Sequence, residues 1–92
     1  MSRLSGIPVV EATYDAASIA DGNEVAVDVT VPGAALGDFV LASLSIDVAD
    51  LVLSVAVTAA DTATAVLANN TGGAIDLASA TLSIYVIPKS VI

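Results

Sequence analysis

The chain contains no cysteine and no histidine. Without these residues it forms no disulfide, and it offers no thiolate or imidazole ligand to a metal ion. Stability is therefore expected to come from packing alone. Histidine is the commonest general base in enzymes and cysteine is a ready nucleophile, so two of the usual catalytic groups are also missing. The sequence predicts no cofactor and no resident metal.

Positive charge is nearly absent as well. Arg3 and Lys89 are the only cations against ten acidic residues, and the formal net charge is −8. Nucleic-acid binding needs clustered lysine and arginine side chains, and two cations near opposite ends of the chain do not form a cluster. The composition therefore excludes nucleic acid as a partner. It favours solubility at high local concentration, or docking on a basic protein surface.

Long apolar runs are also absent, although 57% of the residues are hydrophobic, against roughly 45–50% in ordinary soluble domains. The longest run, residues 51–60, is about half the length of a membrane crossing and lies between two aspartates. The first ten residues lack the apolar stretch of a signal peptide. We therefore expect no membrane partner.

The size of the chain limits its core. A domain of 92 residues buries only about 60–65% of the surface that its unfolded chain exposes. A chain this small and this apolar is expected to cover part of its surface with copies of itself or with a partner. The alternative is a monomer that is merely rich in alanine.

Alternating apolar and polar residues predict β-strands. Turn residues separate the alternating segments at spacings typical of antiparallel proteins. We predict an all-β protein, a small antiparallel β-sandwich or jelly-roll-like domain of about six to eight strands. Residues 1–10 would form an extended arm and residues 11–92 the single domain, with a loop rather than a helical turn at residues 15–20. The predicted strands are residues 9–14, 24–31, 38–46, 51–58, 62–69 and 80–87.

The segment GAALGDF, residues 33–39, follows Pro32 and could be mistaken for a phosphate-binding loop. It lacks the lysine and hydroxyl residue that end a P-loop, and it lacks the third glycine of the dinucleotide fingerprint. We predict a corner between two strands. Gly33 and Gly37 would bend the backbone, Leu36 would plug the edge of the core, and Asp38 would cap the turn.

Three small sets of residues are candidates for chemistry. A serine could use Lys89 as its base, and Asp47 with Asp50 could form a carboxylate pair, but six short strands leave no residues to build a cleft. The segments DGNE (21–24) and DVAD (47–50) are rich in oxygen, as calcium sites are, although neither has the spacing of an EF-hand loop. The simpler interpretation is that these acids cap and solvate turns.

The three aromatic residues, Tyr14, Phe39 and Tyr85, are scattered along the chain. They do not form the stacking platform that bases or sugars require, so we expect them to serve in core or contact packing. Arg3 either anchors an N-terminal arm to a partner's carboxylates or lies in a solvated terminus.

Three segments of the chain form a recognisable ordered set: TYDAASIADG (13–22), VTVPGAALGDFVLAS (29–43) and VTAADTATAVLANNTGGAIDLASATLSIYV (57–86). Together they resemble a module of small structural proteins from tailed bacteriophages. The resemblance covers about residues 14–87, and Ala63, Ala65 and Ala68 are smaller than their counterparts in related sequences. It implies a virion protein with a β-sandwich or jelly-roll fold that serves as a capsid decoration (cement) protein or as a module of a head or tail fibre.

An acidic chain would be repelled by packaged DNA, which favours the capsid exterior. A short chain with no fibrous shaft fits a cement subunit better than a fibre. We therefore expect a homo-oligomer, a trimer, that binds the major capsid protein and bridges neighbouring capsid subunits. The alternatives are a fibre or spike module that attaches to a host surface and, less favoured, a small hydrolase. The expected contact residues are Arg3, Leu4, Ile7, Val9 and Phe39.

Overall fold

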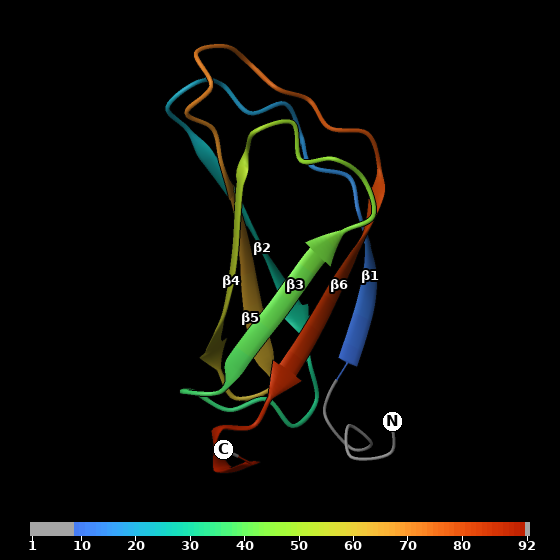
Figure 1. Cartoon of the computed structure of the whole chain (residues 1–92), viewed down its shortest axis with the longest axis vertical. Coiled ribbons are helices and arrows are strands. Elements are labelled where there is room, and N and C mark those ends of the chain that lie inside the picture. The colour runs from blue at the N-terminus through green and yellow to red at the C-terminus, as the bar shows by residue number, and fades with distance from the viewer. Residues whose placement is uncertain (1–8, 92) are drawn as a thin grey trace.

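The computed structural model of the chain describes residues 9–91. Each of the six predicted strand regions is confirmed, and the predicted loop at residues 15–20 contains neither a helix nor a named strand. A short 3-10 turn, η2 (Lys89–Val91), follows the last strand. The strands are β1 (Val9–Tyr14), β2 (Glu24–Thr30), β3 (Phe39–Leu44), β4 (Val52–Ala59), β5 (Thr62–Ala68) and β6 (Ala80–Ile87) (Figure 1).

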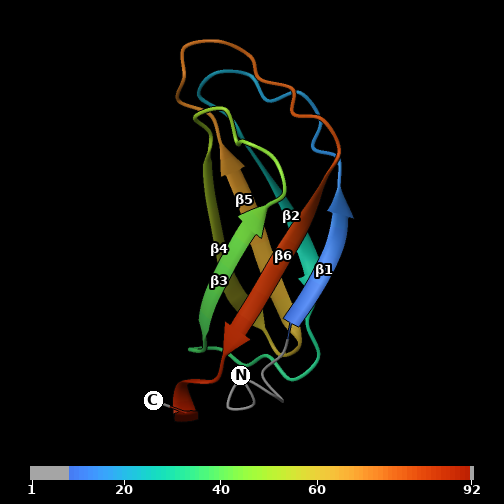
Figure 2. The ribbon, with the colours of Figure 1, turned by 45° about the vertical axis from the view of Figure 1, so that its right-hand side comes forward.

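The six strands form two antiparallel three-stranded sheets, in the orders β1-β6-β3 and β2-β5-β4. The prediction of an all-β protein is therefore confirmed. Only β4 and β5 are consecutive neighbours in one sheet, and every other connection crosses from one sheet to the other (Figures 1 and 2). Because β1 already begins at Val9, both Val9 and Val10 belong to a sheet rather than to an arm.

The core lies between the facing sides of the two sheets. Ala63 and Ala65 of the central strand β5 are completely or almost completely buried, and larger residues of β6 complete the same cluster. Small side chains on one sheet let the larger side chains of the other fill the space between them. The alanine content therefore has a packing role. The buried members are Val29, Val31, Ala34, Val57, Ala63, Ala65, Leu82, Ile84 and Val86.

Asn69 joins the loops at one end of the molecule. Its side chain is fully buried, and its Nδ2 donates hydrogen bonds to the carbonyls of Ile19 (2.7 Å) and Gly73 (2.8 Å). Its Oδ1 accepts hydrogen bonds from the amide and the hydroxyl of Thr71. All hydrogen-bonding positions of the carboxamide are thus occupied, which is the condition for burying a polar group without a large cost.

The corner predicted at residues 33–39 is confirmed, and Asp61 holds it in place. Asp61, in the β4–β5 turn with φ 61°, accepts a hydrogen bond from the Gly33 amide through Oδ1 at 2.8 Å. Gly33 and Gly37 have φ of 90° and 92°, a backbone region that favours glycine. The role predicted for Leu36 is wrong: its side chain is 65% exposed, and Ala34, 3% exposed, faces the core instead.

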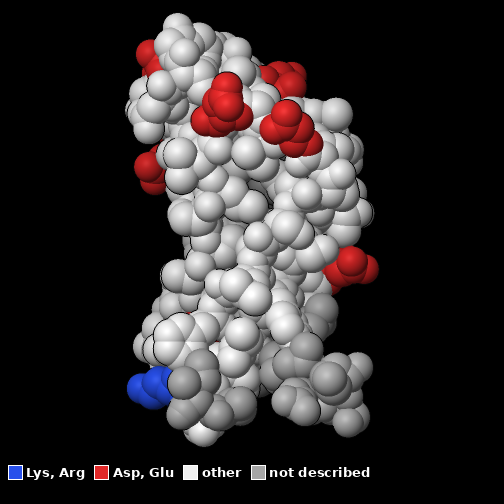
Figure 3. All heavy atoms as spheres, viewed as in Figure 1, with Lys and Arg blue, Asp and Glu red and all other residues white. Residues whose placement is uncertain are grey.

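Acidic side chains gather at one end of the molecule, which we call the acidic end. It carries the loops that join β1 to β2, β3 to β4 and β5 to β6, because all three leave the sheets on the same side. In Figure 3, acidic atoms lie mainly over the upper part of the molecule, with one acidic group at mid-height on the right. The acids at this end are Asp15, Asp21, Glu24, Asp47, Asp50 and Asp76.

The opposite end carries the 33–39 corner, the β4–β5 turn and η2. Its two acids hold backbone amides, since Asp61 binds Gly33 and Asp38 accepts from Ala35 (3.0 Å) and Lys89 (3.1 Å). The long axis between the two ends measures 42 Å. Within the described part of the chain, no helix is long and apolar enough to cross a membrane.

Candidate functional site

The outer face of the sheet β1-β6-β3 carries large apolar side chains near the end opposite the acidic end. Phe39 and Leu41 of β3 are 52% and 60% exposed. On the neighbouring strand β6, Ile87 pairs with Phe39, and Tyr85 pairs with Leu41. Directly paired residues of an antiparallel sheet project from the same face. We call Phe39, Leu41, Tyr85 and Ile87 the apolar patch.

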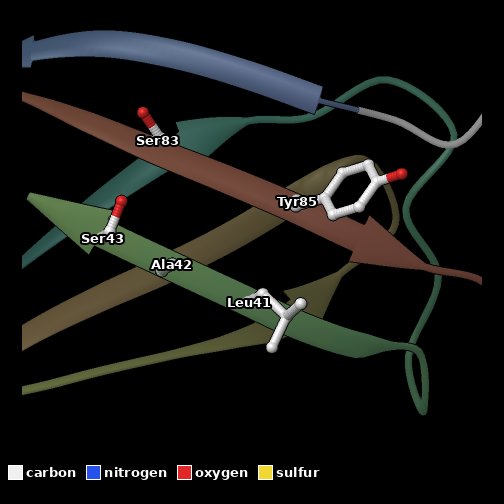
Figure 4. Close-up of a pocket in the computed structure, with 5 residues that line it drawn as sticks. All are labelled: Leu41, Ala42, Ser43, Ser83 and Tyr85. Atoms are coloured by element: carbon white, nitrogen blue, oxygen red, sulfur yellow. The ribbon is translucent and has the colours of Figure 1, made fainter. Parts of the chain in front are cut away.

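A shallow, open depression of about 180 Å³ borders the apolar patch. Figure 4 shows Leu41 and Tyr85 standing on neighbouring strands, with Ser43 and Ser83 further along the same strands and Ala42 turned behind the ribbon. Small-molecule sites usually enclose roughly 300–1,000 Å³ and hold their ligands inside the protein. The depression is therefore better suited to a contact between surfaces than to the enclosure of a small molecule.

Charge is scarce around the depression. Ser83 Oγ donates a 3.3 Å hydrogen bond to the Glu11 carboxylate on β1, at the margin of the outer face. None of the four residues of the apolar patch is Asp, Glu, Lys or Arg. Desolvating these side chains against a partner therefore carries no cost of burying a charge.

The outer face of the other sheet, β2-β5-β4, is different in chemistry. Its central region carries short side chains, and a chain of hydrogen bonds runs from Thr58 Oγ1 to Thr64 Oγ1 (2.8 Å) and on to Asp28 Oδ1 (2.7 Å). Val52, at the acidic end of β4, is 55% exposed and stands on this face. The two outer faces are thus unequal, and the large apolar side chains concentrate on the sheet that contains β3 and β6.

The expected contact residues have three outcomes. Phe39 is exposed in the apolar patch, which is compatible with a contact role. Val9 is the first residue of β1 and pairs with Tyr85. Arg3, Leu4 and Ile7 lie outside the described residues, and their contact role stays a prediction.

Three members of the apolar patch were not among the expected contact residues: Leu41, Tyr85 and Ile87. On β6, the half-buried Tyr85 alternates with the buried Ile84 and Val86. The apolar residues at both parities near Phe39 were a signal that β3 exposes one apolar face. Neither observation revealed that β3 and β6 are neighbours, which is what brings Leu41 beside Tyr85.

The oxygen-rich turns bind backbone amides. Asp21 accepts from the Gly72 amide at 3.0 Å, and Asp47 accepts from the Ala49 amide at 3.0 Å. Among residues 9–91, no group of three or more acidic side chains is arranged to hold a metal ion. The capping interpretation of Asp21 and Asp47 is therefore the one that the geometry supports.

Tyr14 is the aromatic residue that joins both core clusters. Burial raises the pKa of its phenol above the ordinary value of 10.0, because desolvation disfavours the phenolate. Its side chain acts as a packing group at the junction of the clusters. The expectation of core packing is thus met by Tyr14, and that of contact packing remains for Phe39 and Tyr85.

The segments that carry the phage resemblance meet each other in space. Asp61 of AADT (59–62) binds the GAALGDF corner through Gly33. The carbonyl of Asn69, in NNTGG, accepts a 2.7 Å hydrogen bond from Gly22 of the first segment. One of these contacts lies at each end of the fold, and each joins segments that are distant in the sequence. The residues that carry the resemblance thus have a structural role. Comparisons with family models, with curated proteins and with solved structures found no match to the chain.

Proposed function

We propose that the chain is a virion structural protein, a decoration (cement) protein on the outer surface of a phage capsid. The observation that carries this proposal is the unequal surface: an uncharged apolar patch on one sheet face, and six acids gathered at the far end. A protein that covers a shell needs one surface that loses water on contact and another that stays hydrated. The apolar patch and the acidic end fit these two needs.

We further propose that the two sheets form a jelly-roll-like β-sandwich. The strand orders β1-β6-β3 and β2-β5-β4, with connections that repeatedly cross between sheets, support this interpretation. Jelly rolls have eight strands in two sheets and are common in viral capsids. Six strands would make this a reduced form with three strands on each side.

The mechanism would be mechanical rather than chemical. Each copy would contact adjacent subunits of the major capsid protein through the apolar patch and oppose their separation. A ligand that binds only the assembled state stabilises that state, and many copies on one shell multiply the effect. The acidic end would project outward, where its negative charge keeps particles apart.

Binding to capsids is the direct test. Purified protein is sedimented with capsids of its own virus that have been assembled without it, and the bound fraction is measured against concentration. Tyr85→Asp places a charge in the middle of the apolar patch, and we expect it to weaken binding at least about tenfold because the carboxylate must be desolvated. Val52→Asp makes the same change on the other outer face and should bind normally.

Two results would overturn the proposal. Wild-type protein that leaves the capsids in the supernatant has no decoration role, and binding to host envelope or surface polysaccharide instead would favour the fibre or spike alternative. Equal losses for Tyr85→Asp and Val52→Asp would mean that the apolar patch is not the contact surface.

A further inference from the structure

The four edge strands of the two sheets are not equally protected against pairing with another strand. Natural proteins protect sheet edges with charged residues, prolines or bulges. Here β1 carries Glu11, β2 carries Glu24 and Asp28, and β4 has a bulge between Val57 and Ala59. Among these edges of the described chain, β3 (FVLASL) is the one that has neither a charge nor a bulge.

The free edge of β3 has no hydrogen-bonded strand partner within residues 9–91, although β4 of the other sheet lies close to it. All six residues of β3 pair with β6, and within residues 9–91 the strand has no second pairing partner. Its inward side chains, Val40, Ala42 and Leu44, pack on the core cluster to which Leu53 and Val55 of β4 also contribute. Contact with the other sheet therefore runs through side chains and leaves alternate backbone amides and carbonyls of β3 without a strand partner.

We propose that β3 pairs with β3 of a second copy of this chain, in antiparallel orientation about a two-fold axis, to form one continuous six-stranded sheet. The same edge serves on both copies, so the contact closes on itself and needs no further surface. The inference does not rest on the proposed virion role, because it uses only the edge, the faces and the charges of the chain.

The charge distribution selects a second copy in antiparallel orientation as the occupant. A basic partner would be drawn to the acidic end, whereas the exposed residues of β3 are Phe39, Leu41 and Ser43, which carry no charge. Two copies side by side in the same direction would bring twelve acids together, from the six at each acidic end. Antiparallel copies would place these ends at opposite ends of an assembly whose subunits are each 42 Å long, well beyond the screening length of about 8 Å.

The pleat of the strand restricts the register. Opposed residues must project from the same face, so the axis passes through a residue of β3 and not between two residues. With Val40 on the axis, Phe39 lies opposite Leu41 of the second copy, and this pair occurs twice. This register puts the two largest exposed apolar side chains of β3 against each other and merges the two apolar patches.

Sedimentation equilibrium from about 1 μM to about 1 mM tests the assembly, because a contact this small is expected to be weak. The chain mass is 9.0 kDa, and we expect a reversible step to twice that mass. Phe39→Lys and Leu41→Asp should each raise the dissociation constant at least about 100-fold, since each places a charge against an apolar side chain twice. Val52→Asp, which alters an exposed residue of the other sheet, should dimerise normally.

Mixing the two patch variants tests the register. In a mixed dimer, the new lysine at position 39 would face the new aspartate at position 41, and the other pair would remain Leu41 with Phe39. We therefore expect the mixture to dimerise although neither variant does so alone. Circular dichroism of each variant checks that it is folded. Both substituted positions are exposed, so we expect the variants to fold.

Three outcomes overturn part or all of the inference. A wild-type chain that stays monomeric at 1 mM, or one that forms the trimer expected from the sequence, excludes the two-fold contact. A mixture that stays monomeric excludes the register centred on Val40. Loss of capsid binding by Tyr85→Asp with dimerisation intact would separate this inference from the proposed function, because Tyr85 lies on the central strand β6 and not at the edge.

Discussion

Replacing Asn69 by alanine should destabilise the fold strongly, because this polar side chain is fully buried in the loops. The carboxamide is fully buried and makes four hydrogen bonds, two donated by Nδ2 to Ile19 and Gly73 and two accepted by Oδ1 from Thr71. These contacts order the loop at residues 69–73 and join it to Ile19, which lies 50 positions away in the sequence. Asn69→Ala removes all four contacts and leaves a small void.

The expected loss in the free energy of unfolding depends on the hydrogen bonds that the former partners of Asn69 can still make. The carbonyls of Ile19 and Gly73 keep another donor each, Ile75 N and Thr71 Oγ1, and Thr71 is exposed to water. No buried group is therefore left fully unpaired, and the two Nδ2 bonds contribute about 1 kcal/mol each. The void adds about 1 kcal/mol, for a total loss of about 3 kcal/mol.

A loss of this size is readily measured. The free energy of unfolding of a domain of this length is of order 5–14 kcal/mol, and about 3 kcal/mol lowers the melting temperature by roughly 12–24 °C. Urea unfolding followed by circular dichroism gives both the free energy and the slope with denaturant, which should be unchanged if only stability changes. Asn69→Asp keeps Oδ1 but turns a donor into a second acceptor beside two carbonyls, so it should be at least as harmful at pH 7.

The neighbouring Asn70 supplies the matched control. It has the same side chain one position later and is exposed, so Asn70→Ala should change the free energy of unfolding by less than about 0.5 kcal/mol. If Asn69→Ala costs less than about 1 kcal/mol, or no more than the Asn70 variant, the assigned role of the buried carboxamide is refuted.

Three further predictions concern the turns, the core and the phenol. Gly37→Ala should cost about 1–2 kcal/mol because φ is 92°, whereas Gly73→Ala should be near neutral in the same urea assay; equal effects would contradict the strain argument. Ala65→Leu should cost about 1–3 kcal/mol by overpacking, while Ala56→Leu on the exposed face should cost less than about 0.5 kcal/mol. Because burial raises the pKa of Tyr14, its contribution is complete below pH 10.0 and is lost as the pH rises through the folded pKa; Tyr14→Phe should flatten this alkaline decline, and an unchanged decline would exclude Tyr14 as its source.

Local alternation was sufficient to predict the strands. The pattern in β2 and β6 depends on the two-residue repeat of the pleat, which the sequence carries directly. Their bounds fell within one residue of the prediction. The order of strands within each sheet was not predictable in this way, because pairing of β6 with both β1 and β3 joins segments that are distant along the chain.

The loops show why side-chain roles were harder to predict. Asn69 and Asn70 look alike in the sequence, and only the approach of Ile19 across the fold distinguishes them. Leu36 was expected in the core because it is large and apolar. The corner is instead held by Asp61, whose backbone amide donates a 2.9 Å hydrogen bond to the Ala34 carbonyl, and this arrangement turns the smaller side chain inward.

The apolar patch was foreseen only through Phe39. A sequence pattern can say that β3 has two apolar faces, but it cannot say which face meets the core or which strand lies alongside. The position of β3 at a sheet edge next to β6 supplies both facts. For this protein, the interaction surface is a product of sheet order, which only the assembled fold contains.

The pairing of β1 with β6 has a mechanical consequence. β1 begins at Val9 and β6 ends at Ile87, so these two residues lie at the same end of the antiparallel pair. A tensile load applied through these two points would peel β1 from β6 one rung at a time, instead of shearing every rung at once. A partner that covers β3 would not reinforce the contact between β1 and β6. Resistance to pulling would then depend on contacts that hold the free edge of β1.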